Sequence, residues 1–202
     1  MLAIIEAAGW PIWPILFASV IAVTFIIYCL FNLRKSTVAP KELLPRVVQE
    51  YRQGGVNKQM LAKLTANSPL GRIFAAGLRN VSSTREVMKE SIEEAGRAVA
   101  HELERFVPAI GTIASMGPLL GLLGTVIGMI EIFGSQAPTG SSPAQLAHGI
   151  SIALYNTAFG LIVAIPSMFF YRYFRGKIDS LVIDMELQAL KLVEIVHGER
   201  QA

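Results

Sequence analysis

Few side chains in the apolar parts of this sequence could take part in chemistry, and two of them are threonines. Thr125 and Thr157 each lie in a run of glycine, alanine and aliphatic residues. A threonine hydroxyl donates and accepts hydrogen bonds, so it can hold a water molecule or solvate a carboxylate without adding a charge. It can equally bond to a carbonyl of its own helix and serve no further purpose. The residue pattern leaves both roles open.

The ionisable residues near these threonines lie toward the ends of the same runs. His148 could help admit protons, because an imidazole can both take up and release one, but such a histidine is more often a wetted residue at a helix start. Glu131 is equally consistent with a solvated charge at a helix end. The sequence has no GxxxxGK[ST], HExxH or GxSxG motif, and Cys29 is its single cysteine. We therefore predict no enzyme activity, no metal site and no cofactor.

Small residues recur at helical spacing around both threonines. Gly117, Gly121, Gly124 and Gly128 are four, three and four residues apart. The second run repeats the pattern with Ala153, Thr157, Gly160, Ala164 and Ser167. Small residues let membrane helices approach closely. We predict that both faces pack against helices rather than lipid, either within one subunit or around a shared conduit or partner helix.

The composition indicates a membrane protein. The 202 residues are 52% hydrophobic and 16% charged, with a mean hydropathy of +0.49, whereas roughly a quarter of the residues of a soluble domain are charged. A membrane-crossing helix needs about 20 apolar residues, and three stretches qualify, at 13–33, 107–133 and 146–170. The first is not a cleavable signal peptide, because no basic residue precedes it and its apolar run is too long. We predict an all-α protein with three transmembrane helices.

Lysine and arginine fall on one side of these spans. They occur from Arg34 to Arg105 and from Arg172 to Arg200, and nowhere else. The positive-inside rule then places 34–106 and 171–202 in the cytoplasm, and 1–12 and 134–145 outside. The net charge of +3 does not indicate nucleic-acid binding, since the basic residues are dispersed among acidic ones.

The cytoplasmic segments have helical patterns. Apolar residues recur at steps of three and four at Met88, Ile92, Ala95, Val99, Leu103 and Phe106. One apolar face of the tail comprises Ile178, Leu181, Val182, Met185, Ala189, Leu192, Val193 and Val196. With no strong breaker before Pro108, the first helix is expected to continue into the second span. Pro45, Gly54, Gly55 and the turn at 67–69 predict short helices between 41 and 80. The apolar faces need a partner: each other, these short helices or a neighbouring subunit.

A longer string of residues resembles a known family. The string consists of ASMGPLLGLLGTVIGMI at 114–130, followed by GISIALYNTAFGL at 149–161 and AIP at 164–166. In order, spacing and topology it resembles the paired signature of the ExbB, TolQ and MotA family. The likeness extends over almost the whole chain and is greatest to the ExbB and TolQ branches.

The resemblance implies a bacterial inner-membrane protein whose external segments are periplasmic. Family members form a ring, a pentamer in the ExbB branch, around two transmembrane helices of a partner, ExbD or TolR. Proton flow then drives motion that passes to TonB or TolA. By position, Thr125 and Thr157 match the threonines that line the family's pore and face the partner's proton-binding aspartate, while Asn156 and Tyr155 could supply hydrogen bonds nearby.

One residue departs from the family pattern. Ile152 stands where ExbB and TolQ commonly carry a glutamate. A buried ionisable residue is costly in a membrane and usually functional. Its absence indicates that the partner's aspartate carries the protons, as in the MotA branch, or that this chain conducts poorly.

Three functions follow from the resemblance. The first is a ring subunit of an ExbB–ExbD type motor that energises TonB-dependent transport across the outer membrane. The second is a TolQ-like subunit of the Tol-Pal envelope-integrity system. The third, which Ile152 keeps open, is a non-conducting membrane scaffold for a single-span partner.

Overall fold

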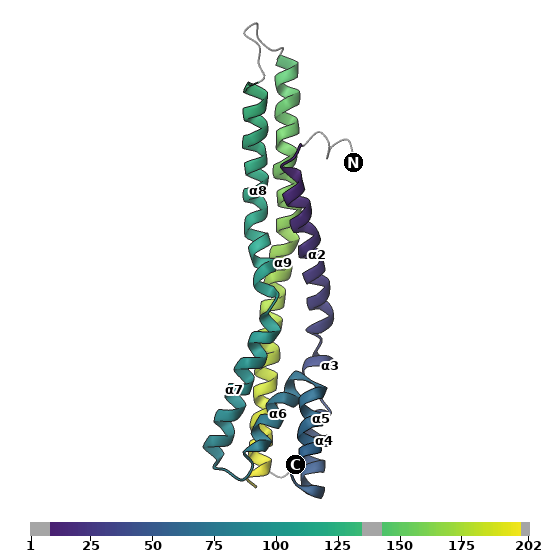
Figure 1. Ribbon diagram of the computed structural model, residues 1–202, viewed down its shortest axis with the longest axis vertical. Helices are drawn as coiled ribbons and strands as arrows, with labels where there is room; N and C mark the ends of the chain where they lie inside the picture. The colour runs from purple at the N-terminus through teal and green to yellow at the C-terminus, as the bar shows by residue number, and fades with distance from the viewer. Residues whose placement is uncertain (1–8, 135–142, 199–202) are drawn as a thin grey trace. The chain divides into compact units, whose positions relative to one another are not determined.

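The computed structural model describes residues 9–134 and 143–198, apart from the side chain of Gln145, and within them every regular element is a helix (Figure 1). The helices are α2 (Ile12–Asn32), α3 (Lys35–Val38), α4 (Leu43–Gly54), α5 (Lys58–Asn67), α6 (Pro69–Arg79), α7 (Arg85–Glu104), α8 (Val107–Gly134) and α9 (Pro143–Val196). The predicted external loop at 134–145 and the N-terminal segment at 1–12 fall largely outside the described residues.

Among the residues that the structure describes, three helical stretches are long and apolar enough to cross a membrane: Ile12–Asn32, Arg85–Gly134 and Leu146–Val196. The predicted all-α class and its three candidate spans are therefore confirmed. Only 17% of the apolar window of α2 is buried inside the protomer. Most of its large side chains must therefore face lipid or other chains.

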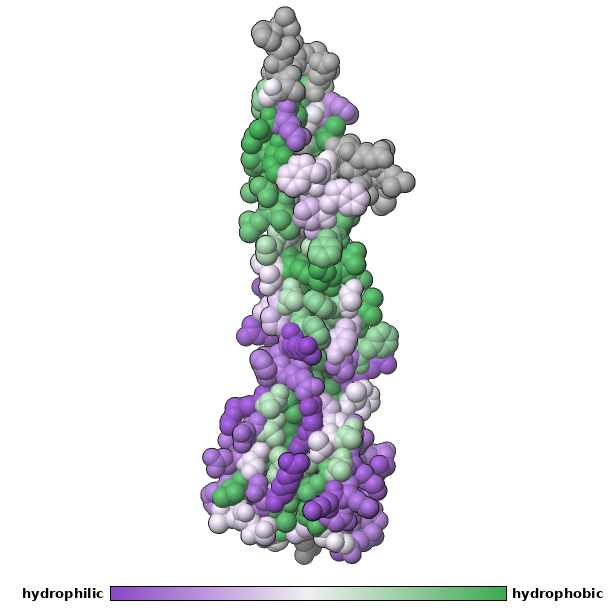
Figure 2. All heavy atoms as spheres, in the orientation of Figure 1, coloured by the Kyte–Doolittle hydropathy of each residue, from purple (hydrophilic) through white to green (hydrophobic). Residues whose placement is uncertain are grey.

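The chain divides into two compact units, and the first holds the apolar helices. This unit comprises α2 up to Tyr28 together with Phe106–Tyr173, so it contains α8 and the first part of α9. Figure 2 shows that hydrophobic side chains dominate its surface on the face drawn. The Phe106 ring packs against Phe25, with centroids 5.1 Å apart, and against Tyr28, with centroids 4.9 Å apart. These ring contacts attach α2 to the start of α8.

The second unit packs large apolar side chains of short helices against α9. It comprises Cys29–Arg105 and the chain from Phe174 onward. The predicted faces of α7 and α9 supply buried residues to its core, including Met88, Val99, Ile178 and Leu181. Among its largest fully buried side chains are also Phe74, Phe174, Leu70, Ile73, Leu78 and Met185. An ion pair between Lys35 and Asp184 joins α3 to α9.

Side-chain caps define the starts of three helices in this unit. Asn57, Ser68 and Thr84 precede α5, α6 and α7, and each side chain accepts a hydrogen bond from a backbone N–H in the first turn. Ser68 is followed by Pro69 at the first helical position, where the missing N–H of proline costs no hydrogen bond. The turn predicted at 67–69 is confirmed.

The helix starting at Arg85 continues into the second span as predicted, since Arg85–Gly134 forms one helical stretch. This stretch is interrupted at Arg105 and Phe106, because α7 ends at Glu104 and α8 begins at Val107. Pro108 has no N–H to donate to the Glu104 carbonyl, which removes the bond that would continue the helix. Pro45, expected to break a helix, lies in the first turn of α4, where an N–H has no helical partner in any case.

Candidate functional site

Glycines in α8 and α9 bring the backbones of the two helices into direct contact. A Cβ atom on Gly160 would lie 2.5 Å from the Gly117 carbonyl oxygen, and one on Gly121 would lie 2.8 Å from the Asn156 carbonyl oxygen. Carbon atoms do not approach oxygen so closely, so neither position accepts a larger residue without movement of a helix. The two helices therefore meet backbone to backbone, which is the contact that small residues permit in a membrane.

The other predicted glycines continue the same contact. A Cβ on Gly117 or Gly128 would lie 3.0 Å from the Cβ of Ala164 or Ala153, respectively. A Cβ on Gly124 would lie 2.7 Å from the Cβ of Asn156. All five glycines selected from the sequence thus face α9 or, for Gly160, α8.

The two threonines meet at the centre of this contact. Thr125 Oγ1 and Thr157 Oγ1 are 2.5 Å apart, and both residues are partly buried. Thr125 Oγ1 also donates to the Gly121 carbonyl at 3.0 Å. Because a hydroxyl has one hydrogen, this bond leaves Thr157 as the donor to Thr125. Thr125 therefore combines the two roles that the sequence left open: it bonds to its own helix and also to the opposite one.

Asn156 and Tyr155 lie on different sides of α9. Asn156 is 1% exposed and packs against Gly124, so it occupies the contact between α8 and α9. Tyr155 is 39% exposed and Ile152 is half-buried. Asn156, which directly precedes Thr157 in the sequence, thus places a buried amide on the face of α9 that contacts α8.

The ionisable residues expected at the outer end are exposed on the protomer. Glu131 lies in the last turn of α8 and His148 in the first turns of α9, and both are solvent- or lipid-accessible. Glu131 is six residues from Thr125 and His148 is nine from Thr157, or about 9 and 13.5 Å along a helix axis, so neither lies beside the threonine pair. The polar groups at this depth are the two hydroxyls and the Asn156 amide.

One contact residue was missed from the sequence. Gly149 faces Ile132 of α8, and a Cβ on it would lie 2.8 Å from the Ile132 Cδ1 atom. Its signal was present, since Gly149 stands four residues before Ala153 and extends the same stripe. Gly111 similarly receives the Tyr171 ring, whose nearest carbon would be 2.8 Å from an added Cβ.

Fold and site together define an all-α membrane protein in which two helices enclose a pair of hydroxyls. A sequence model of the MotA/TolQ/ExbB proton channel family matches residues 65–187. The biopolymer transport protein ExbB-like 3 of Synechocystis is 32% identical over 173 residues, covering 84% of this chain and 82% of that protein. Biopolymer transport protein exbB1 of Vibrio cholerae is 31% identical, with 81% and 74% covered.

Relatives of a second kind match at similar identity. The Tol-Pal system protein TolQ of Pseudomonas aeruginosa is 33% identical over 144 residues, covering 65% of this chain and 60% of that protein. The chain belongs to the MotA/TolQ/ExbB proton channel family, and the resemblance inferred from its residues is confirmed. The chain is therefore a membrane protein, and its family is a proton channel family rather than an enzyme class.

Proposed function

We propose that this chain is the ring subunit of a proton-motive-force-driven motor of the ExbB–ExbD type. In this proposal it lies in a bacterial inner membrane, with its N-terminus in the periplasm and its C-terminus in the cytoplasm. It energises TonB-dependent transport across the outer membrane. The observation that carries the proposal is the Thr125–Thr157 hydroxyl pair between two apolar helices.

The hydrogen bonds of this pair suit a carboxyl group supplied by another chain. The Thr125 hydrogen points to Gly121 and the Thr157 hydrogen to Thr125, so Thr157 Oγ1 retains lone pairs that can accept from a protonated carboxyl. Rotation of the same hydroxyl lets it donate to the ionised form. With Ile152 in place of a glutamate, the titrating group belongs to an ExbD-like single-span partner rather than to this chain.

A ring accounts for the exposed apolar surface of the spans. Leu119, Leu122 and Val126 of α8 and Ile162 and Ile165 of α9 are each about half or more exposed on the protomer. We propose that part of this surface contacts further copies, in a pentamer around the partner's helices, and that the rest faces lipid. Trp10 and Trp13, 60% and 65% exposed, suit the membrane interface.

The TolQ-like role is a second candidate, because TolQ proteins match this chain about as well as ExbB proteins do. Complementation separates the two roles. We expect the chain, expressed with its partner, to restore iron–siderophore uptake to a strain lacking ExbB and ExbD. Restoration of detergent resistance to a strain lacking TolQ and TolR, without restored uptake, would favour the TolQ-like role instead.

Valine substitutions test whether the threonine pair is part of the pathway. We expect Thr125→Val or Thr157→Val to lower uptake at least about tenfold, since a hydrogen bond to a charged group is worth about 1.5–3 kcal/mol. Thr24→Val is the matched control, because Thr24 lies in α2 and donates to the Val20 carbonyl of its own helix. Wild-type uptake by both valine variants would reject a coupled pathway at this pair and favour the non-conducting scaffold.

A further inference from the structure

A continuous stripe of exposed side chains runs along the single helix α2. Its members follow one another at alternating steps of four and three residues, so they lie on one face of the helix; they are Trp13, Phe17, Val20, Thr24, Ile27 and Phe31. We call these six residues the α2 stripe. The five apolar members are each about half or more exposed. Thr24 Oγ1 donates to the Val20 carbonyl, so the one hydroxyl of the stripe is satisfied within its own helix.

The α2 stripe has the length and the side chains of a lipid-facing surface. Trp13 and Phe31 are 18 residues apart, or about 27 Å along a helix axis, which is close to the roughly 30 Å of a hydrocarbon core. The stripe contains no glycine or alanine, whereas the α8–α9 contact is built from both. Helices that pack together in a membrane use small residues. Lipid, rather than another helix, therefore fits this surface.

Arg34 follows the stripe directly. It is three residues past Phe31, and its guanidinium carbon lies 4.8 Å from the centre of the Phe31 ring. The side chain is exposed and makes no capping hydrogen bond to α3. Among the residues that the structure describes, Arg34 has no ion pair. Its neighbour Lys35, by contrast, is paired with Asp184. The stripe therefore ends on a cation whose charge no described carboxylate balances.

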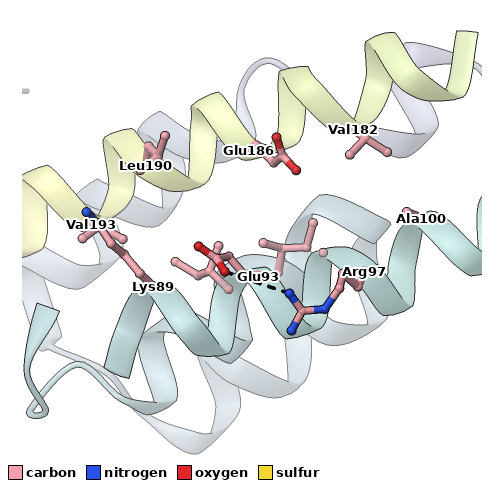
Figure 3. A pocket seen from close by; sticks show the side chains of 11 residues that line it. Lys89, Glu93, Arg97, Ala100, Val182, Glu186, Leu190 and Val193 are labelled. Atoms are coloured by element: carbon pink, nitrogen blue, oxygen red, sulfur yellow. Dashed lines mark ion pairs between the residues drawn. The ribbon is translucent and has the colours of Figure 1, made fainter. Parts of the chain in front are cut away.

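The cations in the groove between α7 and α9 differ from Arg34 in this respect. Lys89 and Arg97 line that groove together with Glu93 and Glu186 (Figure 3). Glu93 and Arg97 approach each other to 4.0 Å. A surface that mixes carboxylates and cations in this way does not select an anion. The isolated charge of Arg34 does.

We propose that Arg34 and the adjoining end of the α2 stripe bind an anionic phospholipid. A guanidinium can hold a phosphate through two parallel N–H donors. The acyl chains lie along Ile27, Leu30 and Phe31, which are 49%, 42% and 60% exposed. An anionic headgroup such as phosphatidylglycerol balances the charge of Arg34, whereas a zwitterionic headgroup brings an ammonium group and leaves that charge unbalanced. The site needs neither a ring nor a partner chain, so it goes beyond the proposed function.

Retained lipid tests the headgroup contact. The purified full chain is released from nanodiscs that hold equal amounts of phosphatidylglycerol and phosphatidylethanolamine, and native mass spectrometry counts the lipids that stay bound. We expect the wild-type chain to retain phosphatidylglycerol in preference. Arg34→Gln should retain about fivefold less of it, and Arg34→Lys should retain an intermediate amount because it keeps the charge without the fork of donors. Arg52→Gln, at an exposed arginine of α4, is the matched control and should retain as much as the wild type.

Fluorescence quenching tests the acyl-chain contact. In a Cys29→Ser background, Val20→Cys and Ile27→Cys each carry a bimane label, and the vesicles contain phosphatidylglycerol brominated on its acyl chains. We expect the bromine atoms to quench both labels. A label on Gln53→Cys, which is exposed on α4 outside the candidate spans, is the control and should stay bright.

Several results would overturn the lipid site. The first is equal retention of phosphatidylglycerol by the wild-type chain and by Arg34→Gln. The second is equal retention of the two lipids by the wild-type chain, since the anionic headgroup would then not be selected. The third is an unquenched label at Val20→Cys together with disulfide-linked dimers of that variant, because a second copy would then cover the stripe. None of these measurements depends on proton flux or uptake, so a failure of this site is distinguishable from a failure of the proposed function.

Discussion

The helix contact of the first unit and the core of the second unit are stabilised in opposite ways. Where α8 meets α9, glycine and alanine bring the backbones together and the polar groups are two hydroxyls and an amide. In the second unit, Phe74, Leu70 and Met88 fill the space between helices with large apolar side chains. Water drives such side chains inward, whereas lipid provides no such drive, so membrane helices rely on close approach.

The largest effect should come from closing the space between the membrane helices. Gly160→Ala would place a Cβ atom 2.5 Å from the Gly117 carbonyl oxygen, so α8 and α9 must separate. We expect loss of assembled complex in size-exclusion chromatography. Gly176→Ala on the same helix has no heavy atom within 4 Å of its Cβ and should be neutral or slightly stabilising. Equal behaviour of the two variants would contradict the account of the α8–α9 contact.

The core of the second unit should respond to a cavity instead. Phe74→Ala removes a fully buried ring from α6 and should cost about 3–5 kcal/mol of stability. Phe17→Ala removes a ring that is 69% exposed on α2 and should have a much smaller effect. Thermal unfolding in detergent compares the two variants. Similar melting temperatures would mean that the second unit is not stabilised by its apolar core.

A charge added to the spans should distinguish a packed face from a lipid face. Ile152→Glu adds a carboxyl group at a half-buried position, and we expect it to be tolerated or to raise proton flux. Ile162→Glu adds the same group where the side chain is 63% exposed, at a cost of about 3 kcal/mol on insertion scales. The amount of membrane-inserted protein measures the difference. A larger loss of membrane-inserted protein for Ile152→Glu than for Ile162→Glu would contradict the assignment of Ile152 to the packed face and of Ile162 to the lipid face.

The smallest effect is expected at an exposed ion pair of the second unit. Arg72 Nη1 lies 2.6 Å from Glu102 Oε2, with the two side chains 35% and 58% exposed. Glu102→Gln should lower stability by less than about 1 kcal/mol, and the difference should shrink in high salt. A loss that persists in 1 M salt would indicate a role for Glu102 beyond this pair.

Much of the fold was predictable because it depends on local patterns. Hydropathy predicted three spans, and Gly54, Gly55 and the turn at 67–69 predicted breaks between the short helices. The interruption before Val107 escaped prediction because it depends on one missing hydrogen bond, from Pro108 to Glu104, in a sequence whose apolar period continues. The position of Pro45 was misjudged because proline breaks a helix interior but fits a first turn.

The site was predictable in its members but not in its geometry. The stripe of glycines indicated that Thr125 and Thr157 lie on packed faces, yet the spacing within each helix contains nothing about which hydroxyl meets which. That pairing depends on the axial register of α8 against α9. The contact of Gly121 with Asn156 and Thr157 sets this register. Which of Asn156 and Tyr155 is buried likewise depends on which face of α9 contacts α8, and the residues of α9 alone do not determine that face.

Proton flux through the purified complex, reconstituted with its partner in liposomes, tests the central claim most directly. Thr157→Val keeps the shape of the side chain and removes its hydroxyl, while Thr157→Ser keeps the hydroxyl and removes a methyl group. If the hydroxyl pair serves a carboxyl on the partner, the valine variant should lose at least about tenfold in flux and the serine variant should retain most of it. Equal flux in both variants, whether high or low, would contradict that role for the pair.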